Sequence, residues 1–128
     1  MEAIRYLTDE ERIRLLARAE SRSYAKDDVV LAEGAYNEDI YILTGGSARV
    51  EVAGTAIGHI AVGEAFGEMS LLDASPAMSS VVADEDAEAY MLPLASVADL
   101  LEEDPTLASH LYHSLAVMLA RRLRERTT

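Results

Sequence analysis

Between residues 24 and 92 the chain divides into short β-branched or aromatic runs separated by glycines, and this pattern restricts the fold more than any other feature. The runs cover residues 29–31, 39–43, 48–52, 55–60, 81–83 and 88–92. At this spacing they predict about seven or eight strands in a sandwich or barrel. Ala53-Gly54, between two alternating runs, predicts the tip of a hairpin.

Helical patterns flank the strands on both sides. Thr8 and Glu11 form a capping box inside a predicted helical segment over residues 3–20. After the strands, apolar residues at helical spacing predict one helix from Leu94, and Pro105 predicts the first residue of a second. We therefore expect a mainly β fold with flanking helices, in one domain over residues 1–128. Its expected parts are a helical N-terminus (1–22), a strand region (23–93) and C-terminal helices (94–126).

The last predicted helix has two apolar lines. Leu111, Leu115 and Met118 form the first, with Arg122 at its end, and Tyr112, Ala116, Leu119 and Leu123 form the second. A helix that packs on one surface needs only one such line. The second line predicts a homodimer through this helix, and one wide face buried within a single protomer is the alternative.

Charge limits the partners. The 128 residues carry a net charge of −12, and between Ser23 and Ala120 only Lys26 and Arg49 are basic. Nucleic acids and anionic membranes both select basic surfaces, so neither is expected as a partner. The chain has no cysteine, which excludes disulfides and favours a cytoplasmic location.

Catalytic and metal-binding patterns are weak. His110 and His113 lie three residues apart on a predicted helix without a matching carboxylate, so no metal site is predicted. The chain has no nucleophile–base arrangement, nucleophile elbow or Walker loop. We therefore do not expect an enzyme.

Residues 63–82 carry the strongest functional signal. Gly63, Gly67 and Glu68 stand at the start of a short predicted helix, and a tight loop with Pro76 follows. Free N–H groups at a helix N-terminus bind anions, and Glu68 can accept hydrogen bonds from a sugar diol. The same loop contains no arginine or lysine to neutralise a phosphate.

With these residues in view, the chain resembles the cyclic nucleotide-binding domain family. The resemblance rests on 31–34, on the glycine-punctuated strands of 39–50, and on Gly-Glu-Ala-Phe-Gly-Glu-Met-Ser-Leu-Leu at 63–72, which is similar to the opening of the family's phosphate-binding cassette. It implies a catabolite-activator-like β-roll, a jelly-roll-like arrangement of strands, with an N-terminal helix and two C-terminal helices. It also implies cyclic AMP or cyclic GMP as a ligand, without a further cofactor.

The resemblance assigns ligand contacts to the first half of the cassette. Gly67 matches the glycine that lets the backbone approach the ribose, and Glu68 matches the acid that accepts the ribose 2′-hydroxyl. Ser70 matches a position whose main-chain N–H faces the cyclic phosphate. Phe66 and Met69 complete this part of the expected binding segment.

The second half departs from the family. Ala77 stands where the family has its phosphate-binding arginine, and Met78 stands where a small or hydroxyl residue is usual, so that its bulk is expected to enter the pocket. Ser79 and Ser80 follow as further candidate contacts. Loss of a buried charge partner weakens binding by about tens- to thousands-fold. Arg49, on a nearby strand, is the candidate replacement.

These observations predict a non-catalytic regulatory module. It would bind a cyclic nucleotide weakly, or a different small ligand, and signal through its C-terminal helix to an effector outside this chain. The alternative is a degenerate β-roll that acts as a structural or dimerisation module without a small ligand.

Overall fold

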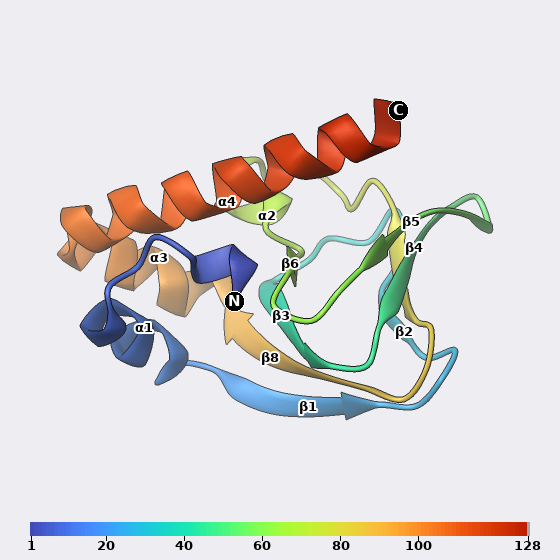
Figure 1. The fold of residues 1–128 in the computed structure, drawn as a ribbon, viewed down its shortest axis with the longest axis horizontal. Coiled ribbons are helices and arrows are strands. Elements are labelled where there is room, and N and C mark those ends of the chain that lie inside the picture. The colour runs from blue at the N-terminus through green and yellow to red at the C-terminus, as the bar shows by residue number, and fades with distance from the viewer. Residues whose placement is uncertain (128) are drawn as a thin grey trace.

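Two antiparallel four-stranded sheets form the body of the protein (Figure 1). The computed structural model describes residues 1–127. The first sheet has the order β1-β8-β3-β6, from Glu20–Tyr24, Ala87–Pro93, Asp39–Gly45 and Ala65–Phe66. The second has the order β2-β7-β4-β5, from Val29–Leu31, Ser80–Ala83, Ala48–Val52 and Thr55–Ile60. This arrangement confirms the predicted β-roll fold.

Helices cover one end of the roll. The 3-10 helix η1 (Glu2–Ile4) and α1 (Asp9–Leu16) precede the strands, and α2 (Met69–Leu72) is the short cassette helix. The last two helices are α3 (Leu94–Glu103) and α4 (Pro105–Thr127). Figure 1 shows α4 as one long helix extending past α3 and α2. Pro105 begins α4 as expected, because proline at the first helical position loses no intrahelical bond.

The predicted helical N-terminus over 1–22 is wrong at its end. The capping box at Thr8 is present, but α1 ends at Leu16, and Glu20–Tyr24 pairs with β8 as strand β1. This strand is mostly exposed and has no apolar alternation, so main-chain pairing with β8 and not side-chain burial defines it. Strand β6 also escaped prediction, because two residues carry no periodicity.

The β4–β5 hairpin forms where the sequence predicts it. Val52 pairs with Thr55, and the two residues between them, Ala53 and Gly54, both have positive φ (51° and 80°). Positive φ at both central residues is the conformation of a type I′ turn, whose twist matches that of the strands.

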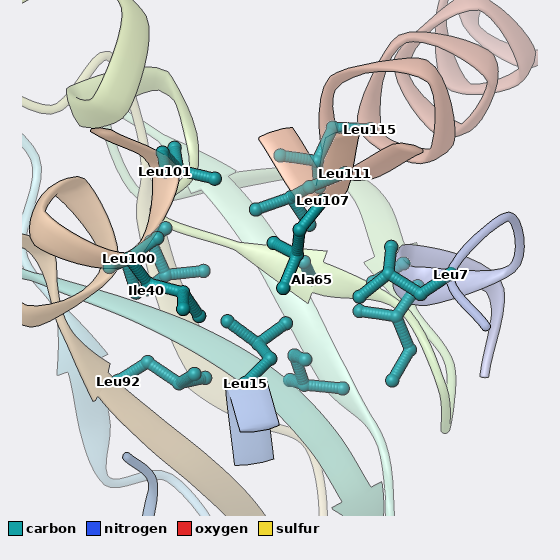
Figure 2. Packing of buried hydrophobic residues seen from close by; sticks show 14 of the residues in the cluster. Leu7, Leu15, Ile40, Ala65, Leu92, Leu100, Leu101, Leu107, Leu111 and Leu115 are labelled. Atoms are coloured by element: carbon teal, nitrogen blue, oxygen red, sulfur yellow. The ribbon is translucent and has the colours of Figure 1, made fainter. Parts of the chain in front are cut away.

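The larger hydrophobic core joins the helices to the first sheet. Leu107, Leu111 and Leu115 of α4 face Ala65 of β6 and Leu15 of α1 (Figure 2). Met118 continues this line and is fully buried. The first apolar line of α4 is therefore a core face, and it fixes α4 against β6, at the start of the cassette.

A second core lies inside the roll. It contains residues of both sheets, namely Tyr41, Leu43, Ala48, Val50, Ile60, Phe66, Val81, Ala83 and Ala87.

Among the described residues, no helix has both the length and the mean hydropathy that a bilayer crossing requires.

Candidate functional site

Gly67 holds the entrance of the cassette in a conformation that other residues rarely adopt. Its φ is +80°, and a Cβ built on it would lie 2.7 Å from both Asn37 Nδ2 and Asp39 O. Asn37 Nδ2 donates a hydrogen bond of 3.1 Å to Gly67 O. The start of β3 therefore fixes the glycine and leaves no room for a side chain.

Glu68 follows Gly67 and is almost completely buried, with 3% of its surface exposed. Its Oε1 accepts a hydrogen bond of 3.1 Å from Arg122 Nη1 of α4. Arg122 Nη2 also donates to Ala65 O of β6. The acid that the resemblance assigns to a ribose is thus ion-paired with the C-terminal helix.

Arg121 makes a second link between the same segments. Its Nη2 donates to Glu64 Oε2 at 2.7 Å, and its Nη1 lies 3.4 Å from Glu2 Oε1. Arg122 Nε lies 3.7 Å from Glu64 Oε2. We call Glu64, Glu68, Arg121 and Arg122 the ion-pair cluster. It connects α4 to residues before and after β6.

Ala77, which stands where the resemblance places the phosphate-binding arginine, has both main-chain groups hydrogen-bonded. Ala77 N donates to Ala35 O at 2.9 Å, and Gly34 N donates to Ala77 O at 2.8 Å. Met78 is 78% exposed, so the expectation that its bulk enters the pocket is wrong. The two bonds at Ala77 fix the main chain against the turn before β3, and the Met78 side chain extends into solvent.

The remaining cassette residues differ in environment. Phe66 is buried and stacks on Tyr41, with ring centroids 4.9 Å apart, and burial raises the pKa of Tyr41 to about 12. Ser70 N donates a long 3.4 Å bond to Gly67 O, and Met69 is exposed. Ser80 Oγ accepts from Glu33 N, and Ser79 is half-buried. The ligand roles assigned to these residues stay predictions.

Arg49 is not brought to the cassette. Its guanidinium contacts Glu51 at 2.6 Å, Asp27 at 3.0 Å and Asp84 at 3.3 Å. These bonds, the one to Glu51 above all, raise its pKa. Its neighbours Ala48 and Val50 face the buried interior of the roll, so strand alternation directs Arg49 to the opposite face. The structure therefore gives Arg49 a role in joining surface loops.

Sequence reasoning missed the partners of Glu68. The useful signal was the register of Arg122, which continues the buried line of Leu111, Leu115 and Met118 on α4. A charged residue on a core-facing line requires a buried partner.

Among the described residues, no group of three or more His, Cys, Asp or Glu side chains is arranged to hold a metal ion.

The family model for the cyclic nucleotide-binding domain matches residues 21–104, which include every strand from β2 to β8 and the whole cassette. The chain belongs to the cyclic nucleotide-binding domain family. The matched range includes the second sheet, the glycine turns and the short cassette helix, and Ala77 lies within it.

Individual relatives agree with this assignment. A cyclic AMP receptor protein from Thermus thermophilus is 33% identical over 124 residues, which cover 93% of this chain and 56% of that protein. Glutaminase 2 from Bradyrhizobium diazoefficiens is 30% identical over 118 residues, covering 91% of this chain and 19% of the enzyme. A solved cyclic nucleotide-binding domain from Methylobacillus flagellatus has a TM-score of 0.86 and 25% identity, over 94% of this chain and 70% of that one. The chain thus spans about half of the receptor and about a fifth of the glutaminase.

Proposed function

We propose that this domain is a non-catalytic regulatory module that binds a small ligand at the cassette, cyclic nucleotides only weakly, and reports its occupancy through α4. The observation that carries the proposal is the ion pair between Glu68 and Arg122. It joins the acid expected to contact the ligand directly to the helix expected to transmit the signal.

The ion pair suggests how occupancy becomes movement. A ligand hydroxyl that donates to Glu68 competes with Arg122 for the same carboxylate. A ligand shifts a conformational equilibrium only through a difference in its contacts between the two states. Here that difference is the exchange of Arg122 for the ligand hydroxyl, which frees the end of α4 to adopt a second packing.

The family relationship supports a regulatory role without catalysis. One relative that matches along most of this chain is named a cyclic AMP receptor. Where the match is to a glutaminase, it covers only 19% of the enzyme. We propose that the effector is a partner protein or a further domain, and that the module works in the cytoplasm, away from nucleic acid and membrane.

Calorimetric titration tests the proposal. We expect saturable binding to the wild-type protein by at least one of cyclic AMP, cyclic GMP, adenosine and guanosine. The Glu68→Gln variant should lose this binding, because the amide cannot accept as strongly. Glu64→Gln is the matched control, since Glu64 belongs to the ion-pair cluster but not to the expected contact set, and it should retain binding. Hydrogen exchange along α4 should increase on saturation.

The second candidate is an interaction module without a small ligand. It is favoured by the second apolar line of α4, where Tyr112 is 41% exposed and Leu123 is 65% exposed. We propose that this line forms a homodimer contact, which either function can use. If none of the four compounds binds while the protein still dimerises, the interaction module is the better account.

A further inference from the structure

Position 77 of the cassette supplies neither a cation nor a free main-chain donor to an anion. The side chain at 77 is a methyl group, and its N–H already donates to Ala35 O. The carbonyl at 77 accepts from Gly34 N, so both main-chain groups are engaged. A phosphate placed there would lose its hydration without a charged partner in return.

Arg49 of β4 and the two arginines of α4 do not compensate for the missing cation. Arg49 is held by three carboxylates on the outer face of its sheet. Arg122 is bound to Glu68 and to Ala65 O, and Arg121 to Glu64 and Glu2. Any charge that Arg122 offered a phosphate would be withdrawn from a buried carboxylate. The net charge of −12 adds a repulsive field against an anion.

The features that suit a sugar are retained. Gly67 keeps the positive φ that lets a ligand approach the backbone, and Glu68 keeps an acid buried beside it. A vicinal diol can donate to a carboxylate without bringing charge of its own. Exposed Met69 and Met78, in the same segment, are polarizable side chains that suit contact with a flat aromatic base.

From this combination, and resting on the proposed function, we infer that the site prefers an uncharged nucleoside to a cyclic nucleotide, and that Ala77 determines this preference. Glu68 accepts hydrogen bonds from the diol of the sugar. A nucleoside has no phosphate, so the site has no negative charge on the ligand to neutralise. Restoring arginine at 77 should reverse the order of affinities.

The experiment compares adenosine with cyclic AMP, and guanosine with cyclic GMP, by calorimetry on the full chain. The wild-type protein should bind the nucleoside of each pair more tightly, and 2′-deoxyadenosine should bind more weakly than adenosine. Ala77→Arg should raise the affinity for the cyclic nucleotide by about tens- to thousands-fold, the range expected for a buried charge partner. Ala74→Arg adds the same charge at an exposed position of the same loop and should leave the order unchanged.

The outcomes distinguish failure of the inference from failure of the proposed function. If the wild-type protein binds the cyclic nucleotide more tightly than the nucleoside, the inference is wrong while the regulatory function stands. If neither class binds, the proposed function fails and the inference fails with it. If Ala77→Arg and Ala74→Arg raise the affinity for cyclic nucleotide equally, general charge and not position 77 determines the preference, which also overturns the inference.

Discussion

At the scale of single residues, the most informative contact is between Glu68 and Arg122. Both side chains are largely removed from water, and the two lie 54 positions apart in the sequence. Removing one partner of a buried ion pair leaves an uncompensated charge, which is more costly than losing an exposed pair. The two arginines of the ion-pair cluster should therefore differ in their contribution to stability.

Arg122→Ala should lower the free energy of unfolding by about 3 kcal/mol, because Glu68 loses a buried ion pair. Arg121→Ala is the matched control. Its side chain is 42% exposed, and its partner Glu64 keeps Arg122 Nε at 3.7 Å and the N–H of Ala61, so its removal should cost less, about 1 kcal/mol. Urea unfolding followed by circular dichroism measures both. Equal losses in the two variants would show that burial of Glu68 does not depend on Arg122.

Alanine substitutions at Gly67 and Gly34 separate the cost of close packing from the cost of backbone strain. Gly67 and Gly34 have nearly the same φ, +80° and +83°, but a Cβ at Gly34 would meet nothing within 4 Å. Gly34→Ala should therefore cost only the left-handed strain, about 1 kcal/mol. Gly67→Ala should cost at least about 1 kcal/mol more, since its methyl group would clash with Asn37 and Asp39. Thermal unfolding tests the difference, and similar melting temperatures would contradict the close packing at Gly67.

The sequence allowed part of this site to be predicted. Gly67 and Glu68 were identifiable because a motif places them next to each other. Asn37 and Arg122 were not, because they reach the cassette from the residues before β3 and from α4, and only the folded chain brings these together. The ion pairs of Glu64, which lies within the cassette, could not be predicted for the same reason. The face on which Arg49 lies could not be predicted, because the alternation of residues along a strand does not reveal which face is buried.

At the scale of elements, predictions succeeded where periodicity was long or a cap was explicit. The start of α4 at Pro105 and the capping box of α1 are both as expected. Prediction failed for β1, whose polar residues carry no strand signal, and for the two-residue β6. Both strands are defined by partners distant in the sequence, β8 and β3, which local propensity cannot supply.

The capping box of α1 also connects α1 to α4 and predicts a pH dependence. Glu11 Oε1 accepts from Thr8 N at 2.8 Å and lies 2.7 Å from His110 Nδ1. The hydrogen bond from Thr8, and then His110, hold the pKa of Glu11 below its usual value. A lowered pKa in the folded state gives stability that is present above the unfolded-state pKa of about 4.3 and is lost as pH falls through the folded value.

Glu11→Gln should therefore flatten the acid side of the stability profile. Glutamine preserves the capping box but cannot titrate, so the variant should be less stable than wild type near neutrality, and the difference should shrink as pH falls below about 4. Glu10→Gln, at an exposed position of the same helix, is the control and should follow the wild-type profile. A constant difference between Glu11→Gln and wild type at every pH would contradict the assigned pKa direction.

At the scale of the whole molecule, α4 has two different faces. One completes the core and ends in the ion-pair cluster, and the other exposes Tyr112, Ala116 and Leu123. A homodimer through the second face would place the α4 helices of the two copies against each other, so that a shift of one helix affects the packing of the other. The net charge of −12 opposes such an association, because two acidic bodies repel at low ionic strength.

If the exposed line of α4 is a dimer contact, sedimentation equilibrium should give twice the 13.9 kDa chain mass for the wild-type protein. Dimerisation should strengthen with added salt, because screening reduces the repulsion between copies while the apolar contact persists. Leu123→Glu should weaken dimerisation by at least about tenfold, since it places a charge in the contact. Ile13→Glu, at a 70% exposed position of α1, adds the same charge elsewhere and should leave the dimer intact. A monomeric wild-type protein at high salt, or equal weakening by both variants, would refute a contact through this face.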